Sequence, residues 1–181
     1  MPKITAQVKA GILELSRKDL EKLVIKAASF NKQFYNYMIV NYTRKTDGEQ
    51  MLFEQAKADL DVLFIKPFKG HSQQLQLTKM LAACNKRIIE FGKICKDKSL
   101  ELNLILYTLE IPFSLPPKIL QTGFKRLHQK IYALLKKAIT LLTTKMHEDY
   151  HLQYASTING YLEILHDHSY LDSVNKIPKS I

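Results

Sequence analysis

The sequence lacks tryptophan and has few cysteines, glycines and prolines. Its 181 residues contain no Trp, two Cys, six Gly and six Pro. So few glycines and prolines exclude collagen-like and low-complexity chains and argue against a β-sandwich, which needs many turns. Two cysteines are too few for a small scaffold held together by disulfides. No stretch of about 18 apolar residues occurs, so we expect no membrane-spanning helix.

The start of the chain and its two cysteines bear on the compartment. The first fifteen residues mix charged, polar and apolar side chains. A signal peptide needs a continuous apolar segment, so we expect none and expect a cytoplasmic protein. Cys84 and Cys95, if one helix carries both, are separated by about 16 Å of helical rise, far beyond the Cα spacing of a disulfide of about 4.4–6.8 Å. We therefore expect two buried thiols.

Apolar residues are plentiful and recur with the period of a helix. They make up 46% of the chain, which is enough to fill a core. The spacing predicts an all-α fold of six or seven helices, either an irregular bundle or a short α-α superhelix. We expect one domain over residues 1–181.

Helix starts are marked by capping residues. Ser16, Asn31 and Ser72 each precede an apolar-periodic segment, as an N-cap does, and Asp47 marks the start of another helix. The stripe after Ser72 comprises Leu77, Leu81, Cys84, Ile88, Phe91 and Cys95. Residues 100–110 are apolar enough for a buried strand, but they are rich in Leu, so we assign a helix.

Three prolines interrupt the pattern. Because a residue before proline avoids the helical region, Pro112, Pro116 and Pro117 predict an ordered crossing loop over residues 111–117. A helix of about thirty residues is expected to follow from Pro117. Its apolar face comprises Leu120, Phe124, Leu127, Ile131, Leu134, Leu135, Ala138, Leu141 and Leu142. A last helix is expected around Ile158, and the polar tail over residues 169–181 is expected to be loosely held.

The charge is positive and unevenly distributed. Lys and Arg number 27 and Asp and Glu 17, giving a formal net charge of +10. By region the net charge is +6 over residues 1–46, +2 over 47–99, +5 over 100–146 and −3 over 147–181. One face of the helix after Pro117 is basic and is a candidate nucleic-acid surface, formed by Lys118, Lys125, Arg126, Lys130, Lys136 and Lys137.

A second basic segment, over residues 32–45, interleaves cations with aromatic residues. Such a mixture can stack unpaired bases. However, Phe34, Met38 and Tyr42 recur at the spacing of one helix face, which favours a core face instead.

One motif carries chemistry. His147, Glu148 and His151 match H-E-x-x-H, in which two imidazoles one helical turn apart bind zinc and the glutamate activates the bound water. Asp149 places a charge inside the motif. A third ligand would be Glu163, His166 or His168, and nothing in the sequence selects among them. A charged helix end is the simpler interpretation, so a metal site is kept as an alternative only.

Several blocks resemble a family of small uncharacterised, all-helical bacterial proteins, a domain of unknown function. They are LSRKDLEKLVIKAAS at 15–29, LTKMLAACNKRIIEF at 77–91, LYTLEIPFSLP at 106–116 and TTKMHEDY at 143–150. The resemblance covers most of the chain. It implies a helical fold, and it implies no activity and no catalytic residues.

Together these patterns favour a non-enzymatic interaction or scaffold protein that binds a protein partner through helix surfaces. A basic nucleic-acid-binding protein is the first alternative, and a metal-dependent hydrolase using residues 147–151 is the second. We expect no cofactor and no membrane partner. Self-association is left open.

Overall fold

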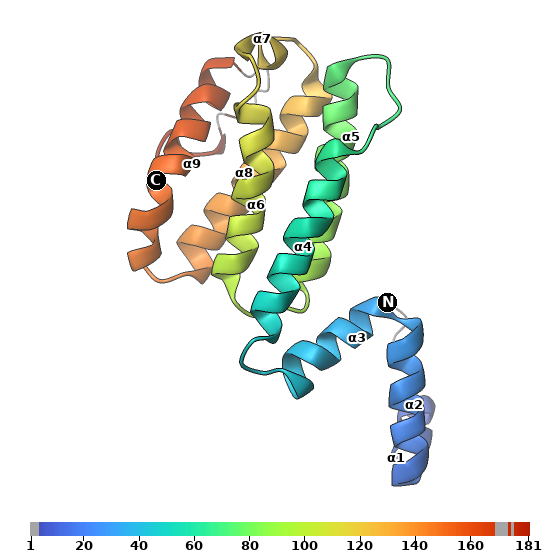
Figure 1. The fold of residues 1–181 in the computed structure, drawn as a ribbon. Coiled ribbons are helices and arrows are strands. Elements are labelled where there is room, and N and C mark those ends of the chain that lie inside the picture. The colour runs from blue at the N-terminus through green and yellow to red at the C-terminus, as the bar shows by residue number, and fades with distance from the viewer. Residues whose placement is uncertain (1–3, 169–173, 175) are drawn as a thin grey trace. The chain divides into compact units, whose positions relative to one another are not determined.

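The structure is a computed structural model that describes residues 4–168, 174 and 176–181, and it is built of helices (Figure 1). In the described part of the chain there is no strand. The elements are α1 (Ala6–Leu13), α2 (Arg17–Phe30), α3 (Lys32–Met38), a π-helical turn η1 (Ile39–Thr43), α4 (Gly48–Ile65), α5 (Gln73–Gly92), α6 (Lys98–Phe113), α7 (Pro117–Leu120), α8 (Lys125–Lys145) and α9 (Asp149–His168).

The predicted capping residues begin their helices. The Ser16 hydroxyl accepts from the Asp19 amide at 3.2 Å, and the Ser72 hydroxyl accepts from the Leu75 amide at 3.2 Å. At the end of α2 the backbone amide of Asn31 donates to the Ala27 carbonyl, and at the start of α3 its side-chain oxygen accepts from two backbone amides. Such bonds satisfy the amides that the first turn of a helix leaves unpaired. The caps Ser16, Asn31 and Ser72 are therefore confirmed.

The all-α class is confirmed, but the expected number of helices is too low. The described residues form nine α-helices, because α1 was not anticipated and the helix expected from Pro117 is divided into α7 and α8. At the break, the Thr122 hydroxyl donates to the Ile119 carbonyl, and the ring Nε2 of buried His128 lies 3.1 Å from the Thr122 carbonyl oxygen. These bonds satisfy backbone groups that a continuous helix would have paired.

Pro112 does not end a helix where the sequence suggested. Helix α6 runs through it to Phe113, so Ile111 is helical rather than extended. Pro112 is the penultimate residue of α6, where the missing amide removes a single bond near the helix end. The connection to α7 is therefore shorter than the expected 111–117 loop.

The chain divides into two compact units, Met1–Gly48 and Glu49–Ile181. We call them the N-terminal unit and the bundle and describe each by itself. The N-terminal unit contains α1 to α3 and η1, and the bundle contains α4 to α9. The single domain over residues 1–181 stays a prediction, which requires that the two units unfold together.

The core of the bundle lies between α5, α6, α8 and α9. Helix α8 packs against the other three, and α5 packs against α6. All six residues of the predicted α5 stripe are buried, and so is the predicted α8 face except for half-buried Phe124. Helix α4 joins this core through side chains, including the Phe53 ring, whose centroid lies 6.4 Å from that of Phe91. Burial of these apolar faces is what holds the helices together.

Both cysteines lie in this core, as the sequence indicated. Cys84 and Cys95 are free thiols with exposed fractions of 0% and 3%. Burial raises the pKa of each thiol to about 12. Because the thiolate is the reactive form, neither side chain is poised for chemistry.

Described residues of the C-terminal tail return to α9. The Asn159 side chain bonds both the amide and the carbonyl of Ile181, at 2.8 and 3.2 Å, and Val174 and Ile177 are buried. Of the tail expected to be loosely held, residues 169–173 and 175 lie outside the described residues. Among the described helices, none is both long enough and apolar enough to span a bilayer.

Candidate interaction surfaces

The N-terminal unit has almost no core. Val40 is its one buried apolar side chain among the described residues, whereas Phe30 is 80% exposed and Leu23 is 45% exposed. Leu23 and Phe30 are seven residues apart on α2, so they lie on the same face of that helix. The other exposed large apolar side chains of the unit are Ile4, Val8, Leu13, Leu15, Ile25, Tyr35, Tyr37 and Tyr42.

The same unit is basic. Residues 1–48 contain nine Lys or Arg and four Asp or Glu, a net charge of +5. Some of these charges pair within one turn, such as Arg17 with Glu21 at 3.1 Å and Arg44 with Asp47 at 3.4 Å. All four of these side chains are more than half exposed, so such pairs add little stability. The unit thus combines exposed apolar side chains with an excess of cations.

The π-helical turn explains why one expected core position is exposed. Phe34 and Met38 are half-buried, but Tyr42 is 61% exposed, so the interpretation of all three as one core face is wrong for Tyr42. In η1 the Arg44 amide bonds the Ile39 carbonyl five residues earlier, which changes the rotation per residue. The turn brings Tyr42 against Tyr37, with ring centroids 6.0 Å apart.

The candidate nucleic-acid residues do not all share one surface. Lys125, Arg126, Lys130 and Lys136 are exposed on α8, while Lys118 lies on the separate helix α7. Lys137 is half-buried and directed to the interior, where its Nζ lies 2.7 Å from Glu101 Oε1. We call the four exposed residues on α8 the basic stripe.

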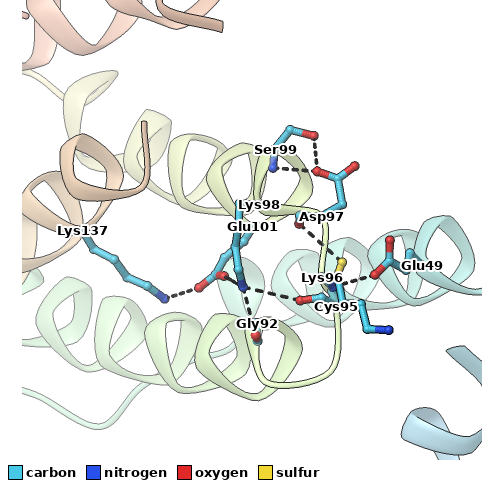
Figure 2. Close-up of polar contacts among 9 residues, drawn as sticks. All are labelled: Glu49, Gly92, Cys95, Lys96, Asp97, Lys98, Ser99, Glu101 and Lys137. Carbon is cyan, nitrogen blue, oxygen red and sulfur yellow. Dashed lines mark hydrogen bonds and ion pairs between the residues drawn. The ribbon is translucent and has the colours of Figure 1, made fainter. Parts of the chain in front are cut away.

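Lys137 belongs to a buried ion cluster that the sequence analysis missed (Figure 2). The Glu101 side chain is 7% exposed and also pairs with Lys98 at 2.9 Å. Lys98 in turn donates to the carbonyls of Gly92 and Cys95 at 3.2 and 3.4 Å, which satisfies backbone groups at the end of α5. The cluster ties α5, α6 and α8 together. Its sequence signal was a single charged residue, Glu101, within the apolar segment 100–109.

Glu101 is held ionised by its partners. Burial acts to raise its pKa, but hydrogen bonds and charge from Lys137 and Lys98 outweigh burial and hold the pKa below the ordinary value. A β-carbon at Gly92 would lie 2.5 Å from the Glu101 carboxylate. Glycine is therefore needed at residue 92 for the carboxylate to approach the helix. With both oxygens paired to lysines, this carboxylate has a structural role.

The H-E-x-x-H residues lie where two elements meet. Helix α9 begins at Asp149, so His147 and Glu148 precede it and His151 is in its first turn. His147 Nδ1 lies 3.0 Å from an Asp149 carboxylate oxygen, and His151 Nε2 lies 3.2 Å from the Leu142 carbonyl oxygen. Among the residues described, no group of three His, Cys, Asp or Glu side chains is placed to hold a metal ion. The metal site at His147, Glu148 and His151 stays a prediction.

A second apolar stripe lies on the outward side of α4. Its members Met51, Val62 and Ile65 are 40%, 62% and 84% exposed, opposite the buried residues Leu52 and Leu60. This stripe was not predicted from the sequence, because helical periodicity was used to identify a single apolar face on each helix. A surface helix with apolar residues on two sides is unusual and marks a candidate contact region.

A cleft lies between α9 and residues near the C-terminal end of the chain. It has a volume of about 640 Å³ and is lined by residues that include Glu163, His166, Asp167 and Lys179. His166 Nε2 lies 3.3 Å from the Pro178 carbonyl oxygen. The lining offers hydrogen-bonding groups and charges of both signs.

No family model, curated protein or solved structure matches the chain. The resemblance to a family of small bacterial proteins therefore stays a prediction that rests on the sequence blocks alone.

Proposed function

We propose that this protein is a non-enzymatic interaction protein in which the bundle is a stable base and the N-terminal unit binds a protein partner. The observation that carries this proposal is the exposure of the apolar side chains of the N-terminal unit. Val40 is buried, while Leu23, Phe30 and eight other large apolar side chains are exposed. Exposed apolar groups gathered in one small unit are typical of interaction sites.

The stability of the N-terminal unit supports this proposal. Its helices α1, α2 and α3 contain 8, 14 and 7 residues. Isolated helices shorter than about 12–15 residues are marginally stable in water, and most helical stability in proteins comes from burying an apolar face. Within this unit there is little such burial. A partner that covers Phe30 and its neighbours would supply it.

The chemistry of the partner follows from the charge. With nine basic and four acidic residues in positions 1–48, the unit fits an apolar groove edged by carboxylates. The partner is therefore an acidic protein surface. We further propose that binding takes place in the cytoplasm, where free thiols such as Cys84 and Cys95 stay reduced.

Site-specific photo-crosslinking in cells that produce the protein tests this proposal. A photoreactive phenylalanine replaces Leu23 or Phe30, and the matched control replaces Thr157, which is exposed on α9. We expect adducts of one defined mass at residues 23 and 30, containing a protein with an acidic surface, and none at residue 157. Equal labelling at all three positions would contradict the proposal, and so would adducts of twice the chain mass, which indicate self-association.

A further inference from the structure

The outward face of α8 is a basic surface that the bundle does not use. Between residues 111 and 146 the chain has seven Lys or Arg and no Asp or Glu. Four of the seven, Lys125, Arg126, Lys130 and Lys136, form the basic stripe and are exposed. Between Lys125 and Lys136 the helix rises by about 16 Å. Cations therefore extend along much of one helix.

Lys137 differs from the residues of the basic stripe because its charge stabilises the fold. Lys137 is on the same helix, but its ammonium pairs with buried Glu101 at 2.7 Å. In the part of the chain that the structure describes, no ion pair joins the basic stripe to a carboxylate. On α2, by comparison, cations have carboxylate partners one turn away, as in the pair of Lys22 and Asp19 at 3.6 Å.

Repulsion between the like charges of the stripe destabilises α8 when no ligand is bound. Arg126 and Lys130 are four residues apart, so their like charges lie side by side and destabilise the helix. An anion bound along α8 would remove this repulsion. An external anionic ligand would therefore stabilise these charges, which no carboxylate of the protein pairs with in the described residues.

The shape of the surface indicates an extended ligand. The two clefts described, one beside α9 and one beside Phe64 and Phe68, contain no residue of α8. The other exposed positions among these cations are Gln129 and Ala133, with Thr140 following. None of these three is aromatic, and Tyr132, one turn before Lys136, is half-buried, so the stripe has no row of exposed rings on which successive unpaired bases could stack. It offers charges at intervals, which suits a repeating phosphate backbone.

We propose that the basic stripe of α8 binds the phosphodiester backbone of a nucleic-acid duplex without reading its sequence. The lysine and arginine side chains contact successive phosphates, and counterions released from the duplex drive the association. This site is separate from the protein-binding surface proposed for the N-terminal unit. Each proposal can fail without the other.

Fluorescence anisotropy with labelled duplexes of about 20 base pairs, one DNA and one RNA, tests the proposal on the full chain. A stripe variant carries K125Q, R126Q, K130Q and K136Q. The matched control carries K9Q, K18Q, K26Q and K45Q, which removes the same charge from exposed positions in the N-terminal unit. Circular dichroism confirms that both variants remain helical.

We expect four phosphate contacts to give a slope of log K against log salt of about −3.6 with DNA, or roughly a hundredfold weaker binding between about 50 and 200 mM salt. The stripe variant should lose nearly all of this slope, and the control should keep it. Binding to either duplex through the stripe supports the proposal, and comparison of the two affinities shows whether DNA or RNA is preferred. No duplex binding at low salt would overturn it. Equal loss of binding in the two variants would also overturn it. Vesicles of anionic phospholipid are tested in parallel, and binding of the stripe to vesicles but to neither duplex would overturn the proposal as well.

Discussion

Replacing Glu101 with glutamine is expected to destabilise the bundle strongly. The substitution keeps the size of the side chain but removes the charge that two lysines share, at 2.9 and 2.7 Å. Lys98 and Lys137 would then face a neutral amide with their own charges only partly hydrated, because their side chains are 30% and 29% exposed. The loss is larger than for a surface pair, since Glu101 is 7% exposed.

The magnitude follows from that burial. Removing one member of a fully buried ion pair costs about 3–5 kcal/mol. Here both lysines keep part of their surface in water, so we expect a smaller loss of about 2–3 kcal/mol in the free energy of unfolding. For a chain of this length each kcal/mol shifts the melting temperature by roughly 2–4 °C, so the midpoint should fall by roughly 5–10 °C.

Urea denaturation followed by circular dichroism measures this loss. The matched control is Glu110→Gln, which removes the same charge from an exposed position on the same helix α6. The control should change the free energy of unfolding by less than about 0.5 kcal/mol. If Glu101→Gln has as small an effect as the control, the cluster does not hold α5, α6 and α8 together and the reasoning is refuted.

The pH dependence gives an independent check on the same carboxylate. Because the folded protein holds the pKa of Glu101 below its ordinary value of 4.5, the unfolded chain binds this proton more readily. The stabilisation is therefore present above pH 4.5 and is lost as the pH falls through the lower pKa of the folded state. Glu101→Gln should make the acid side of the stability profile less steep.

Three further predictions concern the fold. Gly92→Ala should destabilise the bundle by about 1–3 kcal/mol in urea denaturation, because a β-carbon would meet the Glu101 carboxylate at 2.5 Å; an unchanged midpoint would contradict this. Cys84 and Cys95 should resist a thiol reagent at pH 8 in the native protein and both react in urea, since burial raises each pKa to about 12; rapid native labelling would contradict the buried placement. Amide hydrogens of residues 4–48 should exchange much faster than those of α5 and α8, because the N-terminal unit has little core; equal protection would show that the unit is covered.

Much of the fold could be predicted from local sequence patterns. The caps at Ser16, Asn31 and Ser72 depend on side-chain bonds to amides two or three residues away, so the sequence reveals them directly. The α5 stripe is equally local, because its period is that of one helix. These features needed no knowledge of which helices are neighbours.

Other features depend on contacts between distant segments. Lys137 was placed on the solvent face by its helical position, but Glu101 on another helix draws it inward. The division of the expected long helix is supported by His128, which bonds the Thr122 carbonyl. Gly123 lies at that break and was a local signal that could have been used. The exposure of Leu23 and Phe30 could not be predicted, because helical periodicity shows that a face is apolar without showing what covers it.

The affinity for the protein that crosslinks at Phe30 is the most direct test of the central claim, that the N-terminal unit is the binding part. The test variant carries Leu23→Ser and Phe30→Ser, and the matched control carries Ile89→Ser on α5 and Leu152→Ser on α9, two exposed apolar residues of the bundle. We predict that the test variant binds the purified partner at least about thirtyfold more weakly, roughly 2 kcal/mol, while the control stays within about threefold. An unchanged affinity in the test variant, or an equal loss in both variants, would contradict the claim.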